Sequence, residues 1–320
     1  MMNKTLVEHP HLPNALSLTR HYQQAATSDN TRRAYQADIR HFEKWGGKLP
    51  ATTEMVLRYL QTFAPELNPR TLSRRLVAIK QWHIYQQFPD PTATPEVSKT
   101  LTGITRLHGK PAKKAKPLLP EHLIKIVDYL TKQSTLKARR DNALLQMGFL
   151  GAFRRSELVA ITVEDITWHQ EGIEILIPQS KTDAARVGQY CVIPYGNNQL
   201  CAISALKVWL EKANITQGAI FRRIYRNEAI SHTAISDNVV NHLIREYGNI
   251  VGIENFEALS SHSLRRGLAT SASRDGVSIA AIMRQGRWKE VSTIMEYIEA
   301  AQRFDENAAG LVLKKINSIE

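Results

Sequence analysis

Residues 260–298, "SSHSLRRGLATSASRDGVSIAAIMRQGRWKEVSTIMEYI", contain the features that decide how the second half of this chain is interpreted. Apolar residues recur there at helical spacing, and Asp-Gly at 275–276 interrupts the period, so the stretch predicts consecutive short helices. Ser261 and Ser278 are candidate N-caps. Tyr297 fits the same helical period, and by spacing alone it is a packing residue.

Length and composition place the chain among globular proteins. Its 320 residues are 43% hydrophobic and 22% charged, which is enough for two domains with separate cores. Cys191 and Cys201 are too few for a disulfide framework, and no Cys/His cluster predicts a zinc site, so we expect a reducing compartment. Residues 1–24 lack the apolar core of a signal peptide, and no run approaches a membrane span. We therefore expect a cytoplasmic protein without a membrane partner.

Positive charge is concentrated in the first third of the chain. The formal net charge is +12; residues 1–117 hold 18 Lys and Arg against 8 Asp and Glu, whereas residues 118–320 hold 24 against 22. This asymmetry favours a polyanion partner, most simply nucleic acid, because neutralising phosphates releases counterions. A solvated basic surface without a partner is the alternative that composition leaves open.

A break between two domains is predicted at "LHGKPAKKAKPLLP", residues 107–120, which combines three prolines and four lysines without an apolar period. We take residues 1–110 as an N-terminal helical domain, 111–118 as a basic linker and 119–320 as a second domain. The linker is either a solubilising hinge or a segment that lies along a phosphate backbone. In the second case its contact residues are Lys113, Lys114 and Lys116.

The N-terminal domain is predicted to be a helical bundle. Apolar residues repeat at helical spacing in 31–46, 52–63 and 68–88, and each segment is too short to be stable alone, so we expect about four packed helices. His83 lies on the apolar stripe of the third segment. Most basic residues lie away from these stripes, and the candidates for DNA contact are Arg32, Arg33, Arg70, Arg74, Arg75 and Lys80.

The second domain is predicted to be mixed. Residues 173–179 and 189–195 are rich in β-branched side chains and flank a polar turn at 180–188, which indicates a β-hairpin with 166–170 as a possible third strand. Helical periods return on both sides of this region. The chain as a whole is therefore expected to be mainly α, with a small antiparallel sheet in its second domain.

Several charged residues of the second domain become informative when they are considered together. Arg154 and Glu157 are three residues apart, so on a helix the carboxylate can orient the guanidinium. His262 and Arg265 have the same spacing, which puts a ring and a second guanidinium on one helix face. Lys181 lies in the predicted turn. Each of these alone is more often a structural ion pair or a solvated side chain.

The order of these elements, "GAFRRSEL", "QSKTD", "SHSLRRG" and "GRWKEVSTIMEYI", resembles the signature of the tyrosine recombinase (phage integrase-like) family. That signature is an Arg, a Lys in a β-turn, His-x-x-Arg, a His or Trp, and a Tyr nucleophile. Trp288, nine residues before Tyr297, is most similar to the Cre-type branch. The segments "NTRRAYQADIRHFEKW" and "NPRTLSRRLVAIKQWH" also resemble the family's core-binding domain. The resemblance thus implies a SAM-like DNA-binding domain at 1–110 and a catalytic domain with a C-terminal tail helix at 119–320.

Residue roles follow from the resemblance, position by position. It implies that Tyr297 is the nucleophile, that Glu157 is a supporting acidic residue, and that the remaining catalytic positions are Arg154, Lys181, His262, Arg265 and Trp288. A second arginine directly follows each catalytic one, at Arg155 and Arg266. Either arginine of a pair can therefore be the inward one, and the family motif favours the first.

The activity implied by the resemblance is site-specific DNA recombination or integration through a 3′-phosphotyrosine intermediate and a four-way junction. Arginines offset charge on the phosphate oxygens, and Lys181 is the candidate general acid. No metal or nucleotide cofactor is expected. The resemblance implies double-stranded DNA with a specific site as the partner and a homotetramer assembled on two such sites. Whether an accessory protein also takes part is left open by the sequence.

Some features of this assignment stay open. The tail 303–320 is compatible with a helix that docks on a neighbouring subunit or packs on its own domain. The core-binding pattern begins near residues 15–25, so we expect no arm-binding domain before it. The rival functions are a topoisomerase-like or hairpin-resolving enzyme with the same nucleophile, and a DNA-binding relative that does not cut.

Overall fold

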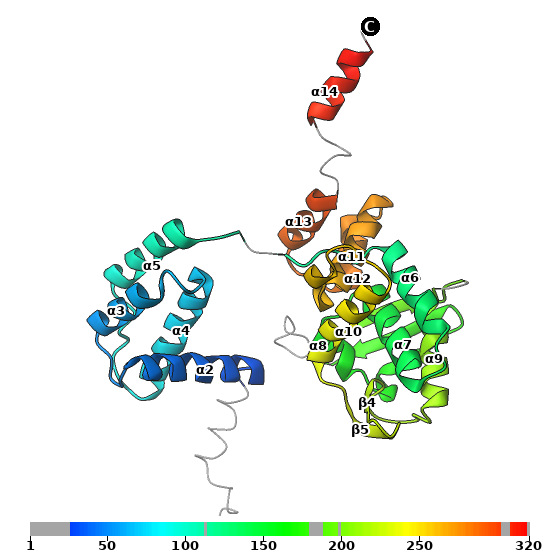
Figure 1. Ribbon diagram of the computed structural model, residues 1–320, viewed down its shortest axis with the longest axis horizontal. Helices are drawn as coiled ribbons and strands as arrows, with labels where there is room; N and C mark the ends of the chain where they lie inside the picture. Colours follow the sequence, from blue (N-terminus) through cyan, green and yellow to red (C-terminus); the bar gives the residue numbers. More distant parts are fainter. Residues whose placement is uncertain (1–25, 112–113, 179–187, 198–199, 302–307, 319–320) are drawn as a thin grey trace, which may run out of the picture. The chain divides into compact units, whose positions relative to one another are not determined.

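The computed structural model describes residues 26–111, 114–178, 188–197, 200–301 and 308–318. The chain divides into two compact units, Met1–Ala112 and Lys113–Glu320 (Figure 1). This division lies inside the predicted linker 111–118. The separate functions given to the two parts stay predictions. Within the part of the chain that the structure describes, no helix combines the length and apolar character needed to cross a membrane.

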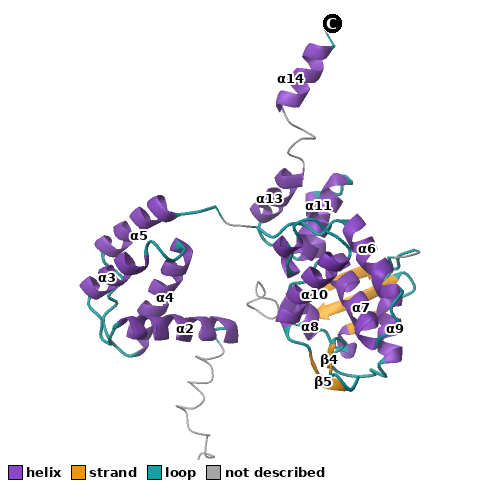
Figure 2. Ribbon diagram, viewed as in Figure 1, coloured by secondary structure: helices purple, strands orange, loops and turns teal. Residues whose placement is uncertain are grey.

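The N-terminal unit is helical, as the sequence predicts (Figure 2). Its helices are α2 (Asp29–Trp45), α3 (Thr53–Phe63), α4 (Pro69–Tyr85) and α5 (Pro95–His108). The Ser28 side chain caps α2 by accepting a hydrogen bond from the Thr31 N–H. Gly46 ends α2 at φ 114°, in the left-handed region that glycine tolerates. The described part of the first unit therefore confirms the expected bundle.

One face of each helix forms the core of this unit. Phe42, Leu60, Leu72 and Ile79 are fully buried, and each such side chain stabilises the fold by about 1.5–3 kcal/mol. His83, predicted on this stripe, is also fully buried. Its Nδ1 lies 2.8 Å from the Ile79 carbonyl oxygen, and its Nε2 lies 2.7 Å from the Ala51 amide nitrogen. Because the carbonyl only accepts and the amide only donates, the ring is the neutral tautomer that carries hydrogen on Nδ1.

A buried charge network links α2 to α3 and α4. Asp38 is 2% exposed and accepts two hydrogen bonds from Arg74, at 2.7 and 2.8 Å. Arg75 Nε lies 3.5 Å from the same carboxylate, and Arg75 Nη1 donates to the Tyr59 hydroxyl at 3.0 Å. Arg75 is 9% exposed. Of the arginines predicted to contact DNA, Arg75 therefore lies inside the bundle, whereas Arg74 pairs with Asp38 from an exposed position.

The second unit contains helices before and after its β region in the sequence. They are α6 (Pro120–Thr131), α7 (Leu136–Leu150), α8 (Arg155–Ala160), α9 (Ala202–Lys212), α10 (Asp237–Ile250), α11 (Ser261–Arg274), α12 (Ile279–Gly286), α13 (Val291–Ala301) and α14 (Ala308–Asn317). Two short 3₁₀ turns are η1 (Val163–Asp165) and η2 (Phe256–Ala258). Ser278 caps α12 as expected, but the cap of α11 is Ser260 rather than Ser261. The tail contains the expected helix, α14.

A three-stranded antiparallel sheet has the order β1 (Ile166–Trp168), β2 (Gly172–Ile177), β3 (Gln189–Pro194). Ile175 pairs with Ile166 on one side and with Cys191 on the other, and all three side chains are buried. The predicted hairpin and its third strand are both confirmed. Lys181, which the sequence predicts in a turn, lies outside the described residues. A second hairpin, β4 (Arg222–Ile224) with β5 (Ile230–Ala234), was not predicted because its residues are mostly polar and exposed.

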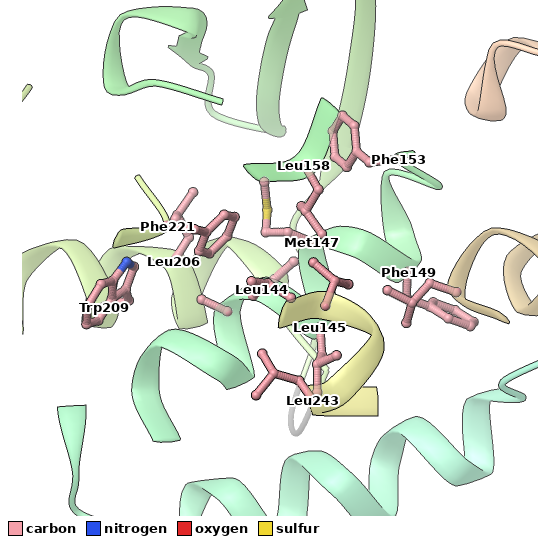
Figure 3. Packing of buried hydrophobic residues seen from close by; sticks show 14 of the residues in the cluster. Leu144, Leu145, Met147, Phe149, Phe153, Leu158, Leu206, Trp209, Phe221 and Leu243 are labelled. Atoms are coloured by element: carbon pink, nitrogen blue, oxygen red, sulfur yellow. The ribbon is translucent and has the colours of Figure 1, made fainter. Parts of the chain in front are cut away.

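The core of the second unit surrounds α7. In Figure 3, Leu144, Leu145, Met147 and Phe149 point from this helix in different directions, and all are buried. Residues 143–149 of this helix are all buried, so this half of α7 must be covered on every side. The covering elements include α6, α9 and α11. This packing fixes the end of α7, from which the chain enters the candidate active site.

We expect Asp38→Ala to lower the free energy of unfolding of the N-terminal unit by about 3–5 kcal/mol, because Arg75 would be left buried without its partner. Hydrogen exchange of the α2 and α4 amides, followed by mass spectrometry on the full chain, measures the loss. Asp29→Ala is the matched control on α2, because Asp29 has a 77% exposed side chain in a surface ion pair worth about 0–1 kcal/mol. Unchanged protection in Asp38→Ala would contradict the prediction.

Candidate active site

Arg154 and Glu157 form the first part of the site, at the start of α8. The Arg154 N–H donates to Glu157 Oε2 at 3.0 Å, and Arg154 Nη1 donates to Oε1 at 2.5 Å. The Glu157 side chain is 3% exposed, whereas that of Arg154 is 21% exposed. Burial opposes ionisation of Glu157, but the hydrogen bonds and charge of Arg154, with the charge of Arg287, outweigh it and hold the pKa of this carboxyl below its usual value. The carboxylate therefore orients a partly accessible guanidinium, as the spacing predicts.

Arg265 extends from α11 into the interior beside this pair. One of its nitrogens donates to the Ala152 carbonyl, and another donates to the Gly286 carbonyl at 2.7 Å. Its guanidinium carbon lies 4.4 Å from the centre of the Trp288 ring. Burial and the nearby charge of Arg154 lower the pKa of Arg265 to about 9, so the side chain is still protonated at neutral pH.

Trp288 and Tyr297 lie side by side, with ring centres 6.2 Å apart in an edge-to-face arrangement. A Cβ atom on Gly286 would lie 1.7 Å from the Trp288 ring, so this position requires glycine. On α13, Ile294 and Ile298 are buried in a small apolar cluster, and Tyr297 packs against it half-exposed. The helical spacing around Tyr297 thus reflects real packing by its neighbours, while its own ring reaches the surface.

An open pocket of about 570 Å³ lies in front of Tyr297. His262 and Arg266 line it together with Lys114 and Glu296, which pair with each other at 2.7 Å. Loss of hydration and the positive charges of Arg265, Arg155, Arg154 and Arg266 lower the pKa of His262. The ring is therefore neutral at pH 7 and can accept or donate a hydrogen bond there.

The two arginine pairs differ in their geometry. Arg155 turns toward α10, where its Nε lies 3.0 Å from Asp237 Oδ2. Arg266 donates to the Ala115 carbonyl at 2.6 Å, and its guanidinium lies 4.9 Å from the centre of the Tyr297 ring. In the first pair, therefore, Arg154 contacts Glu157, whereas Arg155 pairs with Asp237. In the second pair both arginines face the site from different sides.

Arg287 is a contact residue that the sequence analysis missed. It follows α12 at φ 56°, is 6% exposed, and places Nη2 3.3 Å from Glu157 Oε2. Its guanidinium lies 4.9 Å from the centre of the Phe153 ring. A single arginine in a "GRW" loop is typical of a solvated side chain, so no sequence signal marked it as buried.

The residues predicted to contact DNA have varied surroundings. Arg70 is exposed, whereas Arg74 and Arg75 pair with Asp38 as described above. Contacts of the others within the chain are Arg32 with Asp29, Arg33 with Asn30, Lys80 with Asp90, Lys114 with Glu296, and Lys116 with the Glu254 carbonyl. Lys113 lies outside the described residues. Their binding to DNA, like the catalytic roles, stays a prediction.

In the part of the chain that the structure describes, no group of three His, Cys, Asp or Glu residues is arranged to hold a metal ion. The ionisable residues around Tyr297 are mainly cationic, which suits an anion such as a phosphodiester.

Known families and structures match most of the chain. The Phage integrase family matches residues 117–303, and its N-terminal SAM-like domain matches residues 17–86. An "Integrase/recombinase xerD homolog" of Selenomonas ruminantium is 36% identical over 297 residues, covering 90% of this chain and 86% of that protein. "Recombinase cre" of Escherichia phage P1 is 24% identical over 272 residues, covering 80% and 77%.

A solved structure shows the same fold. XerH site-specific recombinase bound to palindromic difH substrate superposes with a TM-score of 0.59 at 19% identity, over 81% of this chain and 71% of that one. The family match alone spans more than half of the chain, over the residues that form the site around Tyr297. On this evidence the chain belongs to the phage integrase family of tyrosine recombinases, which are DNA breaking and rejoining enzymes.

Proposed function

We propose that Tyr297 is the nucleophile with which this recombinase cleaves one DNA strand at a specific site. The observation that carries the proposal is the convergence of Arg265, Trp288 and Tyr297 beside the Arg154–Glu157 pair, next to a pocket lined by cations. These residues come from three separate segments of the chain. A protein that only bound DNA would need the cations but not a tyrosine among them.

The chemistry follows from the donors that the site offers. Arg154 and Arg265 donate hydrogen bonds to the non-bridging oxygens of the scissile phosphate, where negative charge grows. A guanidinium has five N–H donors, so Arg265 can hold the Ala152 and Gly286 carbonyls and the phosphate at once. The indole N–H of Trp288 can only donate, which also suits an anionic oxygen.

In the proposed step, one bond to the scissile phosphorus forms as another breaks. The Tyr297 oxygen forms a bond to phosphorus, and the bond from phosphorus to the 5′-oxygen breaks, leaving a 3′-phosphotyrosine and a 5′-hydroxyl. Neutral His262, which lines the same pocket as Tyr297, is the candidate acceptor of the tyrosine proton, and Lys181 is the candidate donor to the leaving oxygen. A 5′-hydroxyl from a partner strand then attacks the phosphotyrosine and restores the backbone.

The proposed assembly is a homotetramer on two DNA sites, with strand exchange through a four-way junction. Val312, Leu313 and Ile316 of α14 are each more than half exposed, which supports a tail helix that docks on another subunit. We also infer a cytoplasmic location, since a recombinase must reach the DNA on which it acts.

A denaturing gel tests the nucleophile. The cognate site is first selected from a random duplex pool with Tyr297→Phe, and a nicked suicide duplex of that site is then incubated with protein in EDTA. We expect a covalent adduct with wild type and none with Tyr297→Phe, because phenylalanine has no oxygen to attack. Tyr190→Phe, which removes an exposed hydroxyl from β3, is the control and should form the adduct.

Outcomes of that gel separate the alternatives. Wild type that binds the selected site without an adduct would support the DNA-binding relative that does not cut. An adduct without recombinant strands, when two full sites are supplied, would support the topoisomerase-like or hairpin-resolving enzyme. An adduct that persists in Tyr297→Phe would point to another nucleophile.

Two arginines of α4 test the DNA-contact prediction against the structural role. We expect Arg70→Ala to weaken duplex binding and to reduce the slope of log affinity against log salt by about 1, because one phosphate contact is lost. Arg75→Ala should instead lower the melting temperature, because Asp38 would keep only Arg74 as a cationic partner and the Tyr59 hydroxyl would lose its buried donor. Fluorescence anisotropy at several salt concentrations and thermal denaturation of both variants measure the two effects; a salt-slope change in Arg75→Ala alone would reverse the assignment.

The lowered pKa of His262 predicts the pH dependence of cleavage. The second-order rate constant for adduct formation, measured at low protein concentration, reports groups in the unbound protein. We expect this constant to be level between about pH 7 and about pH 8. It should fall below the ordinary histidine value of about 6.5, as the ring becomes protonated, and fall again near the Arg265 pKa of about 9, as that guanidinium loses its charge. His262→Gln should lower the constant by about 10²–10⁴-fold and remove the fall at acid pH. An acid limb that is the same in both proteins would exclude His262 as its source.

A further inference from the structure

Arg287 occupies a position that is unusual for an arginine. It lies between Gly286, which ends α12, and Trp288, with φ 56° and ψ 43°. This left-handed conformation favours glycine and is costly for most other residues. The side chain is nevertheless 3% exposed, so both its backbone and its charge are held under constraint.

Contacts of Arg287 go to the segments that hold the proposed catalytic arginines. Its Nη2 lies 3.3 Å from Glu157 Oε2 and 3.4 Å from the Ala152 carbonyl oxygen. Both terminal nitrogens lie 3.2 Å from the Gly151 carbonyl, and Nη1 donates to the Gln285 carbonyl at 2.9 Å. The guanidinium therefore joins residues 151–157 to the loop that leads through Trp288 to α13.

Glu157 and Ala152 are the shared links in this arrangement. Glu157 uses Oε1 for the Arg154 side chain and presents Oε2 to Arg287. The Ala152 carbonyl accepts from both Arg265 and Arg287. Ala152 itself has φ 44°, so a second left-handed residue holds this carbonyl in place. Each proposed catalytic arginine thus shares a hydrogen-bond partner with Arg287.

We propose that Arg287 is a positioning residue that fixes Glu157 and the Ala152 carbonyl, and through them Arg154 and Arg265, in the orientation required to bind the scissile phosphate. This inference rests on the proposed function. Arg287 acts through these partners and is not expected to contact DNA, because its guanidinium is covered by Phe153 and Gly151.

Electrostatics give Arg287 a second effect on the same site. A Glu157–Arg154 pair alone is neutral, whereas the second guanidinium, that of Arg287, leaves excess positive charge behind the phosphate position. Burial opposes ionisation of Glu157, and the charge of Arg287 assists Arg154 in holding the pKa of the carboxyl below its usual value. Removing Arg287 should therefore raise the pKa of Glu157, and protonation would begin at a higher pH.

The test compares three variants at residue 287 in the full chain. Arg287→Gly suits the backbone conformation and removes the guanidinium, Arg287→Asn tolerates the same conformation with a polar side chain, and Arg287→Lys keeps the charge. Arg284→Ala, on the exposed side of α12, is the matched control for loss of a positive charge. The suicide duplex gives the single-turnover rate of adduct formation at saturating protein, and anisotropy gives the affinity for the same duplex.

We expect Arg287→Gly to lower the single-turnover rate by about 100-fold while its affinity for DNA changes by less than about twofold, because misplacement of the arginines affects the transition state more than binding. His262→Gln removes the acid limb that is assigned to His262, so the pH profiles are compared in that background. There, the limb that comes from Glu157 should move to higher pH in Arg287→Gly and Arg287→Asn. Arg287→Lys should return the limb toward wild type. Arg284→Ala should match wild type in rate and pH profile.

Other results would overturn the inference. A wild-type rate and pH profile in Arg287→Gly would show that the guanidinium has no positioning role. If rate and affinity fall equally while the pH profile is unchanged, Arg287 only stabilises the loop in general and does not position the arginines. The same conclusion follows if Arg287→Lys is as defective as Arg287→Asn. If Arg287→Gly does not fold, Arg287→Lys and Arg287→Asn decide by the same readouts. Absence of an adduct with wild type would instead reject the proposed function itself.

Discussion

The buried carboxylate of Glu157 is the charge on which the geometry of the active site depends. A carboxylate that is 3% exposed must be compensated by cations and hydrogen bonds, since an uncompensated buried charge is strongly destabilising. Arg154 supplies a backbone N–H and a guanidinium, and Arg287 supplies a second guanidinium. Because Arg154 compensates the buried Glu157 carboxylate, its guanidinium is held in one orientation while part of it stays accessible to a substrate.

Both halves of the site are tied together by this compensation. Arg287 belongs to the loop that carries Trp288 and leads to Tyr297, whereas Glu157 belongs to α8, which follows the central helix α7. The ion pair between them is backed by bonds from Arg265 to the Ala152 and Gly286 carbonyls. The segments packed around α7 are therefore joined to the loop that leads to Tyr297 by hydrogen bonds from guanidinium groups to backbone carbonyls, in addition to apolar contacts.

Buried charge also limits what a basic composition means in the N-terminal unit. The excess of Lys and Arg there indicates a polyanion partner, but Asp38 engages Arg74 and Arg75 inside or at the edge of the bundle. Arg70, only a few residues earlier on the same helix, is exposed. Net charge is a sum over the sequence, whereas binding depends on which of those charges reach solvent.

Local patterns were enough to predict most elements. Helical period and β-branched runs depend on residues near one another in sequence, so they predicted the bundle, the hairpin and its third strand. The family was recognised from the order of separated motifs, and the catalytic roles that this resemblance implies stay predictions. The β4–β5 hairpin escaped because its strands are short and have little apolar alternation. The cap of α11 was misplaced by one residue because two serines are adjacent at its start.

Burial of particular charges depended on tertiary packing. Spacing could not show that Arg155 pairs with Asp237, that Arg75 is inside the bundle, or that Arg287 lies against Glu157. The partners in these contacts are far apart in sequence, with the Arg287–Glu157 pair separated by 130 positions. The sequence alone established the residue types and their order, because those are local properties. Which guanidiniums face a phosphate and which support the others became visible only once distant segments were packed, because an ion pair depends on distance in space.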